Sequence, residues 1–117
     1  MARVAVVTGG TRGIGRAISV ALKSAGCKVA ANYGHDDRTA QEFSAETGIP
    51  VYKFDVADFA ACAEGVKAIE AALGPIEILV NNAGITRDTT MQRMSFEQWN
   101  AVIQTNLSSC FNMSRAV

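Results

Sequence analysis

The stretch TGGTRGIG at residues 8–15 restricts the possible folds more than any other part of this sequence. It follows the short apolar run Val4–Val7, which is typical of a buried parallel strand. Apolar residues then recur at helical spacing as far as Gly26, at Ile14, Ile18, Ala21, Leu22 and Ala25. A strand that passes through a glycine turn into a helix directs backbone N–H groups and the positive end of the helix dipole to one point. The stretch therefore predicts a site for an anionic, phosphate-containing ligand.

Strand and helix patterns alternate after this first unit. Short apolar strands are expected at residues 28–32, 51–54 and 76–80. Helices are expected between them, at about residues 37–47 and from the capping Asp58 to Leu73. Strands that alternate with helices of this length imply a parallel sheet with right-handed connections. The sequence therefore predicts an α/β fold, a doubly wound parallel sheet with strand order 3-2-1-4 and a ligand cleft above strands one and four.

The last part of the sequence predicts one long helix. Ser95 and Gln98 fit a capping box at its start. An apolar stripe then runs along the helix through Phe96, Trp99, Ile103, Leu107 and Cys110. No Gly, Pro or charged tail closes the helix, so we expect the chain to stop inside this element and the stripe to require a partner.

Charge and composition argue against several classes of function. The 117 residues carry 11 basic and 11 acidic side chains without a basic patch, which argues against nucleic acid or an anionic membrane as partner. The apolar run before the glycines is too short for a signal peptide or a membrane span, so we expect a cytoplasmic location. One histidine and three cysteines without a C-x-x-C pair predict no metal site and reduced thiols at apolar positions. The expected ligand is a small molecule.

Four motifs, in this order, resemble the short-chain dehydrogenase/reductase family. They are TGGTRGIG with its G-x-x-x-G-x-G spacing, Asp55 after the third strand, NNAG at residues 81–84 after the fourth, and Asn106 in QTNL. A glycine motif alone would be weak, whereas four ordered motifs that span the chain are specific. The resemblance implies a nicotinamide dinucleotide held by Gly9, Thr11, Arg12, Gly13, Ile14, Gly15, Tyr33, Asp55, Asn82, Ala83 and Gly84. It also makes Asn106 a catalytic residue, which holds a water in a proton relay.

Each motif also has a purely structural interpretation. The glycines could build only a tight turn, although a turn needs just one or two of them. Asp55 could close a turn or cap a helix. This role is compatible with the one that the resemblance implies, in which the Asp55 side chain accepts a hydrogen bond from the adenine amino group. NNAG could be a plain polar turn. Asn106 could be a surface residue beside Gln104 and Thr105, although asparagine on an apolar helix costs stability unless its amide is hydrogen-bonded.

The residues favour NADP(H) over NAD(H) as the cofactor. An NAD enzyme needs a carboxylate about 20 residues past the glycine motif, and Tyr33 stands there instead. Arg12, inside the glycine loop, can reach the 2′-phosphate that distinguishes NADP(H). Weaker candidates for the same phosphate are His35 and Arg38, and the acidic residues that reduce the local positive charge are Asp36 and Asp37.

Within the family, the residues from 81 onward are most similar to reductases of short 3-oxoacyl thioesters. The resemblance implies NADPH-dependent reduction of acetoacetyl-CoA, with a carrier-protein thioester as the alternative substrate. A non-catalytic dinucleotide sensor and a structural subunit are the alternatives to an enzyme. The family's catalytic Ser and Tyr-x-x-x-Lys are not found, since neither Tyr33 nor Tyr52 is followed by Lys four residues later. We therefore expect residues 1–117 to be the N-terminal part of one reductase domain, inactive alone and belonging to a homo-oligomer, a tetramer by resemblance.

Overall fold

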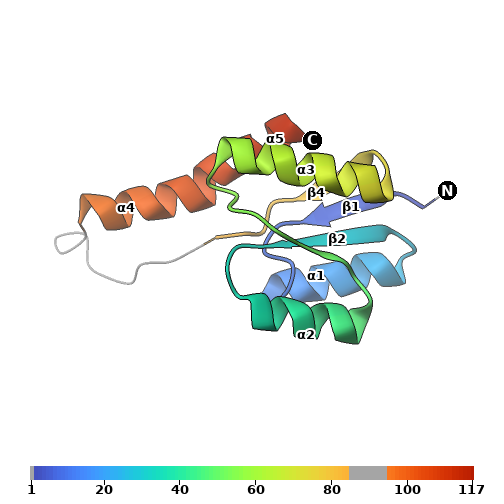
Figure 1. Ribbon diagram of the computed structural model, residues 1–117. Helices are drawn as coiled ribbons and strands as arrows, with labels where there is room; N and C mark the ends of the chain where they lie inside the picture. Colours follow the sequence, from blue (N-terminus) through green and yellow to red (C-terminus); the bar gives the residue numbers. More distant parts are fainter. Residues whose placement is uncertain (1, 85–94) are drawn as a thin grey trace.

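Strand β1 (Val4–Val7) lies inside the sheet, and all four of its residues are buried. In the computed structural model, which describes residues 2–84 and 95–117, β1 pairs in parallel with β2 (Lys28–Tyr33) and β4 (Ile76–Val80). Strand β3 (Val51–Lys53) pairs in parallel with the other side of β2. The strand order is β3-β2-β1-β4 (Figure 1). The predicted parallel sheet and its order are confirmed.

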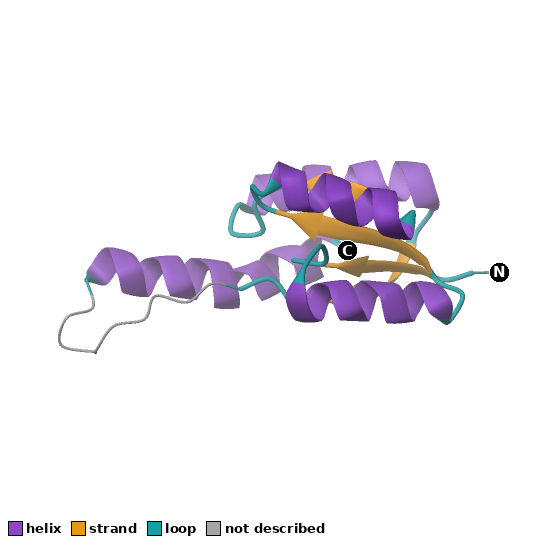
Figure 2. Cartoon of the chain, turned by 90° about the horizontal axis from the view of Figure 1, so that it is seen from below, coloured by secondary structure: helices purple, strands orange, loops and turns teal. Residues whose placement is uncertain are grey.

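Helices cover both faces of the sheet. Helices α1 (Gly13–Ser24) and α2 (Asp37–Thr47) lie on one face. Helices α3 (Phe59–Leu73) and α5 (Ser109–Ala116) lie on the other, so that the strands are enclosed between two helical layers (Figures 1 and 2). The doubly wound architecture predicted from the alternating pattern is therefore confirmed.

The core is divided into two clusters by the alternation of side chains along β1. Val7 packs with Phe43 of α2 on one face. Val6 packs with Ile69 of α3 on the other face. All four side chains are fully buried. Because successive strand residues point to opposite faces, a strand buried on both sides needs the continuous apolar run that the sequence provides.

Capping side chains and a glycine set the helix ends near the predicted positions. Asp36 and Asp58 cap α2 and α3, because their carboxylates accept hydrogen bonds from the backbone N–H of Thr39 at 3.1 Å and of Ala61 at 3.0 Å. Helix α2 ends at Gly48, whose φ of 74° lies in the left-handed region that glycine tolerates. The strand boundaries differ from the prediction by one residue, since β2 is longer and β3 shorter at its carboxyl end.

The predicted C-terminal helix begins at Phe96 but is divided in two. Its capping box is confirmed, because Ser95 Oγ accepts from the backbone N–H of Gln98 at 3.1 Å and Gln98 Oε1 accepts from that of Ser95 at 2.9 Å. Helix α4 (Phe96–Ile103) leads into a π-helical turn, η1 (Gln104–Ser108), and then into α5. The periodicity of the sequence did not predict this turn, which is of a kind frequent at functional sites.

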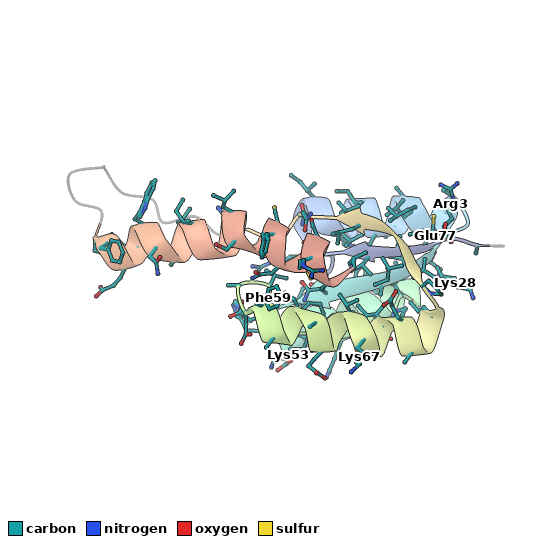
Figure 3. All side chains as sticks on the ribbon, turned by 90° about the horizontal axis from the view of Figure 1, so that it is seen from above. Arg3, Lys28, Lys53, Phe59, Lys67 and Glu77 are labelled. Atoms are coloured by element: carbon teal, nitrogen blue, oxygen red, sulfur yellow. The ribbon has the colours of Figure 1, made fainter. Side chains whose placement is uncertain are left out.

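Helix α5 packs onto the sheet, whereas α4 projects away from it (Figure 1). Met113 is completely buried, and Asn112 Nδ2 donates to the carbonyl oxygen of Val56 at 3.0 Å. The ring of Phe111 stacks on that of Phe59, with centroids 6.2 Å apart. Phe59 lies at the start of α3 (Figure 3). Trp99, in the predicted apolar stripe, is 48% exposed. The stripe therefore predicted the apolar surface of α4 but missed the face through which α5 packs.

At Gly65, helix α3 packs tightly against Phe54, the residue that follows β3. A Cβ built on Gly65 would overlap the ring of the buried Phe54 and lie 2.8 Å from its Cγ. Alanine in a helix gains about 1 kcal/mol over glycine, but overpacking a core costs about 1–3 kcal/mol, occasionally more. We expect Gly65→Ala to lower the free energy of unfolding, by about 1 kcal/mol net, in urea denaturation. Ala68→Gly, at an exposed site of the same helix, measures the propensity effect alone, and a more stable Gly65→Ala variant would contradict the predicted steric conflict.

Candidate functional site

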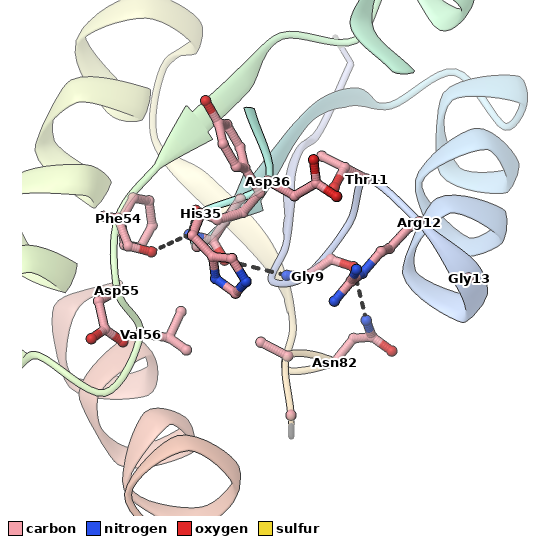
Figure 4. A pocket seen from close by; sticks show the side chains of 15 residues that line it. Gly9, Thr11, Arg12, Gly13, His35, Asp36, Phe54, Asp55, Val56 and Asn82 are labelled. Atoms are coloured by element: carbon pink, nitrogen blue, oxygen red, sulfur yellow. Dashed lines mark hydrogen bonds between the residues drawn. The ribbon is translucent and has the colours of Figure 1, made fainter. Parts of the chain in front are cut away.

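A cleft of about 660 Å³ opens at the carboxyl ends of the four strands (Figure 4). Parallel α/β sheets bind ligands at this edge, and the volume suits a small molecule or cofactor. All the predicted cofactor-binding residues line the cleft except Ile14 and Gly15. The lining residues are Gly9, Thr11, Arg12, Gly13, Asn32, Tyr33, Gly34, His35, Asp36, Phe54, Asp55, Val56, Asn82, Ala83 and Gly84. The fold thus gathers motifs that are far apart in the sequence around one cavity.

The glycine loop needs its glycines for two different reasons. Gly9 and Gly13 have φ angles of 60° and 57°, a region that residues with a Cβ rarely adopt. Gly15 is buried in α1, where a Cβ would overlap the carbonyl oxygen of Gly9 and lie 2.6 Å from Asn82 Nδ2. Gly15 therefore lets α1 pack against the loop. Ile14 is 75% exposed and lies outside the cleft lining, so its contact with a cofactor stays a prediction.

The NNAG segment is hydrogen-bonded to the strand that leads into the glycine loop. Thr8 Oγ1 accepts from the backbone N–H of Asn82 at 2.9 Å and of Ala83 at 3.0 Å. Asn82 Nδ2 donates to the carbonyl oxygens of Thr8 and Gly9, both at 3.1 Å. The amide of Asn82 therefore fixes the position of the loop, which is a structural role in addition to its place in the cleft wall.

Asn32 is a site residue that the sequence reasoning missed. It is buried in β2, where its Oδ1 accepts from the backbone N–H of Gly9 at 3.2 Å and its Nδ2 donates to the carbonyl oxygen of Phe54 at 2.9 Å (Figure 4). It thereby joins the glycine loop to the chain beyond β3. Its signal is present in the sequence, because an asparagine inside an apolar strand must find hydrogen-bond partners for its amide.

The N-terminus of α1 is arranged to receive an anion. Arg12 is the residue before the helix, but its side chain does not cap it, and the first turn carries no acidic residue. Among the described residues, Arg12 forms no ion pair with a carboxylate. The helix dipole and the first-turn N–H groups favour phosphate. Gly9 and Gly13 also line the cleft and have no Cβ to keep a ligand away from the backbone, so this donor set fits the pyrophosphate of a dinucleotide.

The far rim of the cleft carries a group of ionisable side chains. The Tyr33 hydroxyl donates to Asp37 Oδ1 at 2.9 Å, and partial burial together with this carboxylate raises the pKa of Tyr33. Asp37 also pairs with Lys53 at 3.2 Å, and the hydrogen bonds from Tyr33 and Lys53 lower the pKa of Asp37. Arg38 pairs with Glu42 at 3.2 Å and does not line the cleft, whereas His35 does.

Asp55 closes a turn, which is one of the structural roles expected from the sequence. Its Oδ1 accepts from the backbone N–H of Ala57 at 2.9 Å and closes the turn before α3. Asp55 also lines the cleft at the end of β3. The turn and a contact with adenine are compatible, and the second remains a prediction.

Asn106 lies beside the carboxyl end of the NNAG segment. It belongs to the π-helical turn η1, and a Cβ built on Gly84 would lie 3.0 Å from Asn106 Oδ1. Gly84 lines the cleft, so the fold brings Asn106 close to the cavity although it is 22 residues further along the chain. Its backbone carbonyl oxygen accepts from Cys110 Sγ at 3.6 Å.

The remaining expectations concern thiols, metals and membranes. Cys27, Cys62 and Cys110 form no disulfide. Cys62 is buried, and burial, with smaller contributions from Asp55 and Asp58, raises the pKa of its thiol to about 11, which makes it a poor nucleophile. Within residues 2–84 and 95–117, no group of three His, Cys, Asp or Glu side chains could hold a metal ion. In the same residues, no helix has the length and apolar character needed to cross a membrane.

Comparison with known families decides the classification. Residues 3–117 match the sequence profile of the family described as short chain dehydrogenase. The chain belongs to this family. The resemblance inferred from the four motifs is therefore confirmed.

Three similar curated proteins carry two related names. The chain is 61% identical to acetoacetyl-CoA reductase of Shinella zoogloeoides over 117 residues, which cover 100% of this chain and 48% of that protein. It is 59% identical to acetoacetyl-CoA reductase of Paracoccus denitrificans, with the same coverage. A 3-oxoacyl-[acyl-carrier-protein] reductase of Escherichia coli is 44% identical, over 98% of this chain and 48% of that protein. The chain thus spans about half the length of the curated relatives it matches.

A solved structure supports the same fold. The short-chain dehydrogenase structure from Novosphingobium aromaticivorans superposes with a TM-score of 0.93 at 28% sequence identity. The match covers 97% of this chain and 43% of that one. The doubly wound arrangement is therefore that of a solved short-chain dehydrogenase.

Proposed function

We propose that the chain is the dinucleotide-binding part of a reductase that uses NADPH to convert acetoacetyl-CoA to the 3-hydroxyacyl thioester. The observation that carries the proposal is the cleft, in which the glycine loop, the α1 N-terminus and Arg12 lie together. The substrate is suggested by two relatives named acetoacetyl-CoA reductase, at 61% and 59% identity.

Each part of the cleft has a proposed task. The first-turn N–H groups of α1 and the backbone at Gly9 and Gly13 would hold the pyrophosphate. Arg12 would bind the 2′-phosphate, and the Asp55 carboxylate would accept a hydrogen bond from the adenine amino group. Thr11, Ile14, Tyr33, Asn82, Ala83 and Gly84 would complete the wall, and Gly15 would keep α1 against the loop. The bound cofactor supplies a hydride to the 3-oxo carbon of the thioester.

The catalytic groups are proposed to be shared between this chain and a following segment. By family resemblance, a tyrosine assisted by a lysine would protonate the carbonyl oxygen of the substrate. Residues 1–117 contain no Tyr-x-x-x-Lys motif that could supply this pair. Asn106 would hold a water in the proton relay to that tyrosine. We propose that the chain is the N-terminal part of one reductase domain in a cytoplasmic homo-oligomer, a tetramer by resemblance. Intact mass of the purified protein tests whether the chain is part of a longer reductase domain, and light scattering tests whether the protein is a tetramer.

Steady-state NADPH oxidation by the full-length protein tests the proposed activity. The two substrates to compare are acetoacetyl-CoA and acetoacetyl-acyl carrier protein. We expect kcat/KM to be higher for the CoA thioester by about tenfold or more, a difference of about 1.4 kcal/mol in transition-state binding. The reverse preference would favour the second candidate, which the 44% identical carrier-protein reductase supports. Dinucleotide binding without turnover of either thioester would favour a sensor.

Asn106 is expected to affect turnover more than cofactor binding. In the full-length protein, Asn106→Ala should lower kcat about threefold to tenfold, the value of one hydrogen bond that holds the relay. The Kd for NADPH should change by less than about twofold, since Asn106 lies beside the cleft lining and not in it. Asn100→Ala, at an exposed site of α4, is the matched control. An unchanged kcat for Asn106→Ala would remove it from the mechanism.

A further inference from the structure

Asp36 brings a carboxylate into the cleft, at a position other than the one where the family spacing places the carboxylate of an NAD enzyme. Tyr33 occupies the place where an NAD enzyme carries its acid, and Asp36 follows three residues later as the cap of α2. Asp36 and Arg12 both line the cleft. Figure 4 shows the Asp36 carboxylate directed toward the glycine loop, from which Arg12 projects. The two opposite charges therefore share one end of the cavity.

The carboxylate of Asp36 is held in place by one residue. Its Oδ1 accepts from the backbone N–H of Thr39 at 3.1 Å, and its Oδ2 accepts from Thr39 Oγ1 at 2.7 Å. These hydrogen bonds favour the charged form, and they lower the pKa of Asp36. Asp36 therefore presents a fixed negative charge at neutral pH.

The neighbouring charges are already compensated by other partners. Asp37 pairs with Lys53 at 3.2 Å, and Arg38 pairs with Glu42 at 3.2 Å. Among the described residues that line the cleft, Arg12, Asp36 and Asp55 are charged and form no ion pair, and Asp55 lies at the end of β3, where it closes the turn before α3. The electrostatic choice between a phosphate and a hydroxyl on the adenosine ribose thus depends mainly on Arg12 and Asp36.

We propose that Asp36 is a specificity-determining residue that opposes Arg12 and lets the site accept NADH as well as NADPH. The inference rests on the proposed function, which places the adenosine ribose at this end of the cleft. A 2′-phosphate carries a charge of about −1.5 to −2, which Arg12 attracts and Asp36 repels. A ribose without the phosphate presents hydroxyl groups, which can donate hydrogen bonds to the side-chain oxygen of either aspartate or asparagine. Arg12 alone would select the phosphate strongly, and Asp36 reduces that selection.

The test replaces Asp36 by asparagine in the full-length protein. Asparagine is as good a helix cap as aspartate, so the variant removes the charge and keeps the start of α2. The ligands are adenosine 2′,5′-bisphosphate and AMP, which differ by the 2′-phosphate and need no nicotinamide site. We expect Asp36→Asn to lower the Kd for the bisphosphate about threefold to tenfold in calorimetric titration and to change the Kd for AMP by less than about twofold. The matched control, Asp37→Asn, removes the same charge beside Lys53, outside the cleft lining.

Three results would overturn the assignment. An unchanged Kd for the bisphosphate would show that Asp36 does not oppose the phosphate, and a weaker one would show that it serves to position Arg12. An equal gain in Asp37→Asn would show an effect of net charge alone. A wild-type protein that binds neither nucleotide would refute the proposed function together with this inference, whereas the first three results leave the function standing.

Discussion

Replacing Gly15 by alanine is expected to abolish useful dinucleotide binding. The added Cβ would overlap the carbonyl oxygen of Gly9 and lie 2.8 Å from its carbonyl carbon, and backbone atoms cannot turn aside as a flexible side chain can. Alanine's better helix propensity, about 1 kcal/mol, is too small to offset this conflict. We expect the free energy of unfolding to fall by about 3 kcal/mol. In the protein that remains folded, the displaced loop should weaken NADPH binding by about ten- to a hundredfold, the value of one charge-assisted hydrogen bond to the phosphates.

Gly34 provides the matched control for this substitution. It also lines the cleft, but no atom lies within 4 Å of a Cβ built on it, and its φ is not in the left-handed region. Gly34→Ala should therefore retain both stability and NADPH binding to within about 0.5 kcal/mol. Chemical denaturation and fluorescence titration of the two full-length variants make the comparison. Gly15→Ala with wild-type affinity would mean that α1 can move away from the loop without consequence.

The fold was predictable because each element carries its own local signal. The run Val4–Val7 is short, rich in β-branched residues and apolar at every position, as a strand buried on both faces requires. Asp58 and the pair Ser95 and Gln98 mark helix starts through short-range hydrogen bonds, which depend on spacing alone. Strand order followed from the doubly wound pattern, because alternation of strand and helix permits few arrangements of a parallel sheet.

The features that escaped prediction depend on contacts between distant residues. Asn32 serves the site through a bond to Gly9, which is 23 residues away in sequence, and periodicity cannot reveal such a partner. The packing face of α5 follows a π-helical turn, which breaks the helical period that the apolar stripe assumed. Asp36 enters the cleft through the turn geometry between β2 and α2. Motifs located the site, and the three-dimensional structure was needed to place its charges.

Replacing Arg12 by alanine should weaken the binding of NADPH about ten- to a hundredfold and that of NADH by no more than about twofold. A charge-assisted hydrogen bond to phosphate contributes about 1.5–3 kcal/mol, which corresponds to this range, and NADH lacks the 2′-phosphate. The Arg12 side chain does not cap α1, so its loss leaves the helix start intact. Asp36, at the same end of the cleft, reduces the net attraction and places our expectation nearer to tenfold in the wild-type background.

Arg38→Ala separates this contact from the general effect of losing a positive charge. Arg38 pairs with Glu42 and lies outside the cleft lining, so its removal should change the NADPH Kd by less than about twofold at physiological salt. Fluorescence titration of NADPH and NADH with each full-length variant gives the ratio of the two Kd values directly. Equal losses of NADPH and NADH in Arg12→Ala would assign the side chain to the pyrophosphate shared by both cofactors. A selective loss in Arg38→Ala instead would move the phosphate contact from the glycine loop to α2.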